Sequence, residues 1–179
     1  MRLDLGPWQP VTAEQWAGAV GFAAVVVALL VAGDPGWTPI LDSANLAFHE
    51  AGHLIYGVLG DTAELYGGVV GQLTFPMVAL VVFALRRQAH AVAVAAVWLC
   101  QNLMNIARYM ADARAGELPL VGGGEHDFLH IFTRWEALDA DTTVAAWTRG
   151  LGWLGGAAAL AWLTWRWRRD AADDARTAR

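Results

Sequence analysis

Two histidines and a glutamate stand at the spacing of a zinc-binding helix. Residues 48–54 read Phe-His-Glu-Ala-Gly-His-Leu, which contains the pattern H-E-x-x-H. On a helix, His49 and His53 share one face, where two imidazoles can bind a single zinc ion. Glu50 then lies beside the metal, placed to take a proton from an activated water. The pattern predicts a hydrolytic site with Zn2+ as cofactor and Glu50 as catalytic residue. Two hydrogen-bonded core histidines with a structural glutamate are the alternative.

A catalytic zinc site also needs a third protein ligand and an open position. The extended metzincin pattern fails here, because the position that requires glycine is Tyr56. The third ligand must therefore come from farther along the chain. We rank His126 first and Asp112 second, and we place His130 a distant third. Asp127 is expected to orient a ligand from the second shell. A solvated loop histidine is the alternative for His126.

The composition indicates a membrane protein. Hydrophobic residues make up 56% of the 179 residues and charged residues only 16%, against roughly 25% charged in an ordinary soluble domain. The mean hydropathy is +0.37. A net charge of -5 leaves no basic footprint for nucleic acid. Cys100 is the only cysteine, so an internal disulfide and a cysteine-based zinc site are both excluded. The metal ligands must be His, Asp or Glu.

The apolar segments predict an all-α, polytopic transmembrane bundle of four or five membrane helices. They are residues 17–32, 42–59, 73–85, 89–110 and 144–165, and the second carries H-E-x-x-H. We expect one integral membrane domain over 1–179, with a polar N-terminal segment 1–15, a site loop 112–141 and a charged tail 166–179. The lipid bilayer is the implied partner. Asp42 or Ser43 is the expected cap of the second helix. Residues 61–66 are expected to break the chain before a non-helical entry into the third.

Basic residues predict the orientation in the membrane. Arg86 and Arg87, and then Arg166, Arg168 and Arg169, are expected on the cytoplasmic side. The C-terminus is then cytoplasmic, and the loop 112–141 lies outside. If the H-E-x-x-H helix crosses fully, there are five spans, and if it is re-entrant, there are four.

A polar face interrupts the segment 89–110. Asn102, Asn105, Tyr109 and Asp112 recur at steps of three or four and therefore share a helix face. Polar groups inside a bilayer often mark function, so Asn102 and Asn105 are candidates for second-shell or substrate contacts. Hydrogen bonding between helices is the alternative. In the last span, Gly152 and Gly156 form a G-x-x-x-G pattern that predicts close helix packing.

The zinc-binding helix resembles that of intramembrane metalloproteases of the site-2-protease type. Those proteases take the third ligand from an Asp on a later membrane helix, and Asp112 is the nearest equivalent. Over residues 45–141 the chain more closely resembles small bacterial membrane proteins considered to be zinc peptidases. The motifs that carry this likeness are HEAGH, Gly67-Gly68 with Gln72, Gln101-Asn102, Tyr109, Asp112 with Arg114, Leu118-Pro119-Leu120, Gly122-Gly123 and His126-Asp127. The resemblance implies a bacterial inner-membrane peptidase.

The function that we expect is a membrane-embedded zinc metallohydrolase. Its expected substrate is a membrane-associated peptide or protein. A non-catalytic metal-binding protein and a structural membrane protein are the alternatives from other functional classes. No oligomeric state is predicted.

Overall fold

Helices form the whole regular structure of the described residues. The computed structural model describes residues 5–33, 37–121 and 126–177. The motif Gly122-Gly123 lies outside them. The elements are α1 (Ala13–Ala32), α2 (Pro39–Gly57), α3 (Asp61–Leu85), α4 (Ala89–Ala111), α5 (Asp127–Arg134), the 3-10 turn η1 (Leu138–Ala140) and α6 (Asp141–Thr177). The predicted all-α class is confirmed.

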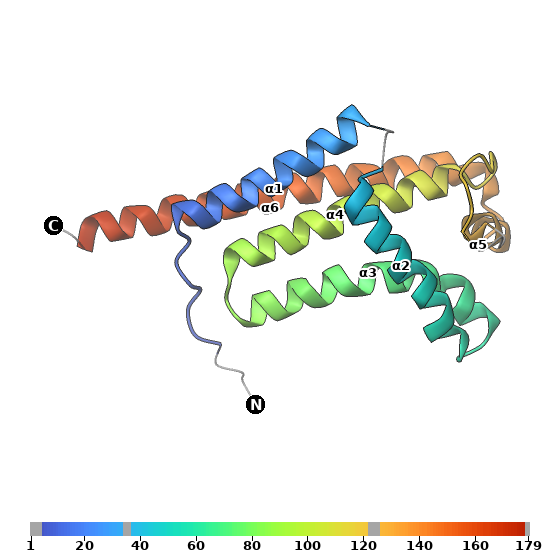
Figure 1. Cartoon of the computed structure of the whole chain (residues 1–179), viewed down its shortest axis with the longest axis horizontal. Helices are drawn as coiled ribbons and strands as arrows, with labels where there is room; N and C mark the ends of the chain where they lie inside the picture. The colour runs from blue at the N-terminus through green and yellow to red at the C-terminus, as the bar shows by residue number, and fades with distance from the viewer. Residues whose placement is uncertain (1–4, 34–36, 122–125, 178–179) are drawn as a thin grey trace.

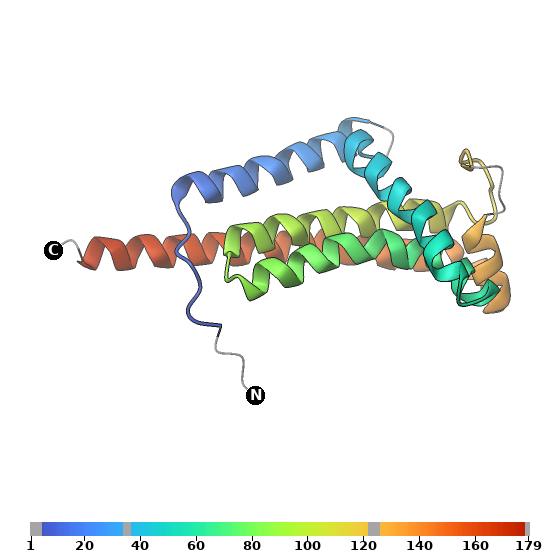
Figure 2. The same cartoon turned by 60° about the horizontal axis from the view of Figure 1, so that its bottom comes forward.

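Helix α4 is the element on which the bundle is built. It packs against α6, α3 and α1 (Figure 1). The helix α2 instead crosses obliquely over α3 (Figure 2). At one end, Gln9 N donates to the Arg87 carbonyl (2.9 Å) and Val11 N donates to Asp170 Oδ2 (3.0 Å). The turn after α3 and the last part of α6 therefore lie at this basic end, while α5 lies at the opposite end (Figure 1).

Among the described residues, three helices are long and apolar enough to cross a membrane, which indicates a membrane protein. They are α1, α3 and α4. The number of four or five spans stays a prediction. Helix α6 is long, but its glycines, tryptophans and Arg149 lower its hydropathy. It nevertheless packs closely on α4, since a Cβ on Gly152 would lie 2.8 Å from the Cys100 carbonyl oxygen. The close packing predicted for Gly152 is confirmed, whereas a Cβ on Gly156 would make only an ordinary contact (3.8 Å).

Helix α2 begins four or five residues earlier than expected. Thr38 is its N-cap and Pro39 its first helical residue, where proline costs no hydrogen bond. The prediction that Asp42 or Ser43 caps the helix is wrong. The Asp42 carboxylate instead accepts a hydrogen bond from Thr38 N, and it is fully buried. Asp42 thus stabilises the first turn from inside the helix.

Helix α3 is continuous, so the predicted break at 61–66 and the non-helical entry are wrong. The glycines that suggested a bend serve a close helix crossing instead. A Cβ on Gly67 would lie 2.7 Å from the Gly52 carbonyl oxygen, and one on Gly71 would lie 2.6 Å from the Phe48 carbonyl oxygen. Only glycine allows the two backbones to approach this closely. The crossing holds the H-E-x-x-H segment of α2 against α3.

Pro76 lies inside α3 and is tolerated because another helix supplies the missing hydrogen bond. Proline has no N–H, so the carbonyl of Gln72, four residues earlier, loses its helical donor. Asn102 Nδ2 donates to that carbonyl (2.9 Å) and also to Asn45 Oδ1 (3.2 Å). Asn102 is fully buried and joins α4 to α2 and α3. These contacts agree with the alternative given above for Asn102, which is hydrogen bonding between helices.

Candidate metal centre

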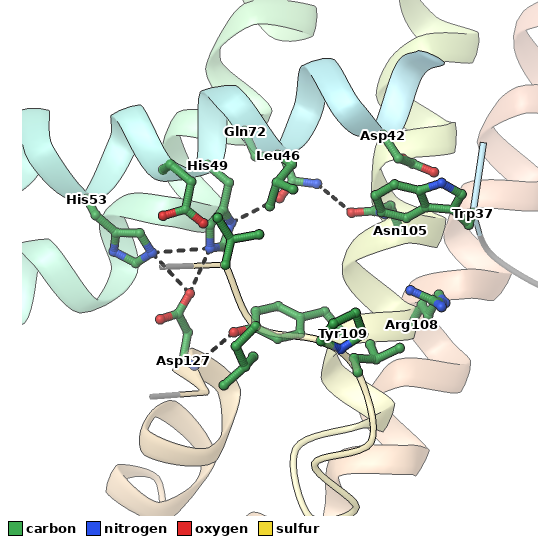
Figure 3. Close-up of a pocket in the computed structure, with 15 residues that line it drawn as sticks. Trp37, Asp42, Leu46, His49, His53, Gln72, Asn105, Arg108, Tyr109 and Asp127 are labelled. Carbon is green, nitrogen blue, oxygen red and sulfur yellow. Dashed lines mark hydrogen bonds and ion pairs between the residues drawn. The ribbon is translucent and has the colours of Figure 1, made fainter. Parts of the chain in front are cut away.

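Three side chains from two helices converge at the α5 end of the bundle. Helix α2 places His49 and His53 on one face, with 3.1 Å between their Nε2 atoms. Asp127, the first residue of α5, places Oδ2 at 2.8 Å from His49 Nε2 and 3.2 Å from His53 Nε2 (Figure 3). His49 and Asp127 are buried and His53 is half-buried. These three residues form a group that can hold a metal ion.

The outer nitrogen of each imidazole contacts a carbonyl oxygen. His53 Nδ1 lies 2.8 Å from the backbone oxygen of Glu64. His49 Nδ1 lies 3.2 Å from Gln72 Oε1, and Gln72 Nε2 donates to Asn105 Oδ1 (2.9 Å). Carbonyl oxygens only accept, so both Nδ1 atoms carry the hydrogen. A neutral imidazole with its hydrogen on Nδ1 has its lone pair on Nε2, the nitrogen that faces Asp127 in both rings.

This arrangement brings together three atoms that can each offer a lone pair. The two Nε2 atoms and the carboxylate oxygen lie within 2.8 to 3.2 Å of one another, and a proton or a metal cation among them offsets the repulsion of their lone pairs. Donors at about 2.0–2.1 Å from a tetrahedral zinc lie about 3.3 Å apart. The donor types and spacing therefore fit a zinc-like ion, with one coordination position left for water.

Packing of α5 determines where Asp127 lies. Phe128, Ile131 and Phe132 are buried in one core cluster together with Ile106 of α4. The backbone N–H of Asp127 donates to the Tyr109 hydroxyl (3.1 Å). Both contacts fix the start of α5, and they direct the carboxylate of Asp127 toward α2.

The ranking of third ligands stays a prediction, and the structure adds Asp127 as a candidate ligand. The metal-binding group contains Asp127 and neither His126 nor Asp112. His126 stacks on the Tyr109 ring, with centroids 4.1 Å apart, and its Nε2 lies 3.3 Å from Asp112 Oδ2. Burial lowers the pKa of His126 below its ordinary value, and Asp112 opposes this shift. Neighbouring residues at a helix start point in different directions, which sequence order alone does not resolve.

Asp112 ends α4 and organises the chain that follows. Its carboxylate accepts hydrogen bonds from Glu117 N (2.9 Å) and Leu118 N (3.1 Å). These bonds hold residues 117–121 beside the metal centre, where 118–121 line a cavity. Asp112 thus positions a wall of the site. His130, ranked third, lines a separate cavity and is also outside the metal-binding group.

Glu50 lines the same cavity as the three candidate ligands. This cavity has a volume of about 620 Å³ and also contacts Asn105 and Gln72. Glu50 is half-buried, so its carboxylate is available at the cavity beside His49. Asn105 acts on the site through Gln72. Whether Asn105 supports a metal ligand through this hydrogen bond or contacts the substrate stays a prediction.

Two features of the site were not assigned from the sequence. Gln72 contacts His49 Nδ1, and no spacing in the sequence pairs these two residues. Gly68 lies directly against both imidazoles. The closely spaced glycines signalled a tight backbone approach, but the partner of that approach lies on another helix. Comparison of the chain with family models, with curated proteins and with solved structures found no match.

Proposed function

We propose that this chain is a membrane-embedded zinc hydrolase that cleaves peptide bonds. The observation that carries the proposal is the convergence of His49 Nε2, His53 Nε2 and Asp127 Oδ2, with Glu50 on the adjoining cavity. The resemblance of residues 48–54 to the zinc helix of membrane metalloproteases supports the choice of metal and reaction. Bound zinc would lower the pKa of a water at its open position to about 7 and polarise the scissile carbonyl.

The protein groups supply orientation and proton transfer. Gln72 and the Glu64 carbonyl hold the two imidazoles in the tautomer that leaves Nε2 free. Glu50 is the proposed general base, which accepts the proton of the attacking water and passes it to the leaving amine. The Tyr109 hydroxyl accepts from Asp127 N and keeps the third ligand in place.

The outward face of α2 supports a site inside the membrane. Asp42, Asn45 and His49 are buried on its inner face. Its outer face carries the exposed apolar residues Ile40, Leu54 and Ile55, and the exposed Val58 and Leu59 follow directly after the helix. A soluble helix has the opposite arrangement, with the apolar face toward the core. We therefore place α2 in the hydrocarbon layer as a re-entrant helix, with α1, α3, α4 and α6 as four crossing helices and the C-terminus in the cytoplasm.

Metal content tests the first half of the proposal. Protein purified in detergent should contain one zinc per chain by inductively coupled plasma mass spectrometry, and His49→Ala should contain none. His90→Ala is the matched control, because His90 lies in α4 near the turn after α3 and should keep its zinc. Equal zinc in His49→Ala and wild type would overturn the proposed centre.

Hydrolysis of an internally quenched peptide in micelles tests the second half. Glu50→Gln should retain zinc and lose at least about 100-fold in kcat, as expected for loss of a general base. Glu14→Gln, in the exposed first turn of α1, is the control and should remain active. Unchanged hydrolysis in Glu50→Gln would remove the proposed base while leaving the metal centre. Zinc without any hydrolysis in wild type would favour a metal-binding protein.

A further inference from the structure

A second cavity reaches the metal centre from another side. It has a volume of about 670 Å³ and is lined by Asp61, Glu64, Thr133 and Arg134, among others. His53 and Asp127 line this cavity and also the first one. The candidate metal position therefore lies where two cavities meet. We call them the ligand-side cavity, which contains Glu50, and the α5-side cavity.

The two cavities differ in chemistry. The ligand-side cavity has an apolar wall formed by Leu46 and residues 118–121. Beside that wall, Gln72 bonds His49 and Asn105, and Tyr109 bonds Asp127. The charged side chains of Asp42, Glu50 and Arg108 also line this cavity. The α5-side cavity has only Leu65 as an aliphatic lining residue among charged and polar ones. Apolar groups thus favour the first cavity and hydrated groups the second.

We propose that the substrate is a chain that spans both cavities, with its scissile bond at the junction between an apolar and a hydrophilic segment. This inference rests on the proposed hydrolase function. The apolar segment lies along residues 118–121, and the hydrophilic segment lies along Thr133 and the first turn of α3. The bond between the segments then lies beside His53 and Asp127, which both cavities share. The attacking nucleophile is water, which Glu50 would deprotonate from the ligand-side cavity before passing the proton to the leaving amine.

Cleavage-site mapping tests this substrate class. Reporter peptides would carry a Leu-rich segment followed by a Ser/Lys-rich segment, with the junction moved by three residues between two reporters. Mass spectrometry of the products should show the cleaved bond moving with the junction. Cleavage at a constant distance from either terminus, or inside one segment in both reporters, would overturn the proposal. Leu120→Asn should raise KM for these reporters at least tenfold, whereas the matched control Leu85→Asn, at the far end of α3 and outside both cavities, should change KM less than threefold.

Thiol accessibility tests the two environments without requiring catalysis. Cys100 is buried, so Cys100→Ala provides a background without cysteine. Leu120→Cys or Thr133→Cys would be added singly and the protein placed in lipid vesicles. A charged maleimide should react with Thr133→Cys at least tenfold faster than with Leu120→Cys, and a lipid-soluble maleimide should react with both. Equal rates with the charged reagent would overturn the proposal. If no reporter is cleaved, the hydrolase function fails and this labelling still decides whether the cavities differ.

Discussion

Gly68 lies so close to His49 that a Cβ built on it would be 2.5 Å from His49 Nε2. The same Cβ would be 2.5 Å from His53 Nε2. Helix α3 thus presents bare backbone to the two nitrogens that would bind the metal. Gly52, Gly67 and Gly71 bring α2 and α3 into this contact, and a side chain at position 68 would fill the space that the ion needs.

Gly68→Ala should therefore abolish stoichiometric zinc binding. The methyl group would displace both imidazoles, so we expect affinity to fall by more than about 100-fold, beyond the usual cost of losing an orienting partner. Helicity by circular dichroism should be unchanged, because alanine is a good helix former. Gly21→Ala, which meets nothing within 4 Å, should bind zinc normally. Full zinc content in Gly68→Ala would contradict the site geometry.

Variants of neighbouring residues should identify the third ligand. Asp127→Ala removes a carboxylate within 3.2 Å of both imidazoles and leaves two protein ligands in place of three, so zinc should be lost. His126→Gln should keep one zinc per chain with at most about a tenfold loss of affinity, since His126 acts through Tyr109. Zinc analysis of both purified variants measures this. The opposite result would make His126 the ligand, as its rank in the sequence suggested.

Gln72→Met should weaken metal binding while leaving the fold intact. Methionine is similar in size to glutamine but lacks the oxygen that holds His49 Nδ1. The ring can then rotate or change tautomer, and we expect a loss of about 10–100-fold in affinity, measured by competition with a chromogenic chelator. Gln88→Met, just before α4, is the matched control. An affinity equal to wild type would mean that Asp127 alone orients His49.

At low pH, the Asp141 carboxylate should lose its contribution to the free energy of unfolding. Asp141 lies just before the predicted span 144–165. Hydrogen bonds from Arg114 (2.9 and 2.7 Å) hold the pKa of Asp141 below its ordinary value. A lowered folded-state pKa means that the stabilisation is present at neutral pH and is lost as pH falls through that pKa, below about 4. In the presence of a metal chelator, Arg114→Gln should have a lower melting temperature than wild type at pH 7. This difference should shrink at pH 3, and a difference that grows on acidification would refute the pairing.

The sequence by itself determined what depends on local spacing. The i, i+4 geometry of a helix places His49 and His53 on one face wherever that helix lies. The apolar segments likewise predicted α1, α4 and the later part of α3, since their length and hydropathy are properties of each segment alone. The run of small residues around Gly68 also signalled a close backbone approach.

Only the tertiary structure decided what the histidines face. Asp127 and His126 are adjacent, and both can ligate zinc, so their order in the chain carries no preference. Burial of Phe128, Ile131 and Phe132 fixes how α5 docks, and that docking turns Asp127 toward α2 and His126 toward Asp112. Helix α3 stays continuous because Asn102, from a distant segment, supplies the donor that Pro76 lacks. Such long-range packing energies are absent from local sequence patterns, and they complete the centre that H-E-x-x-H begins.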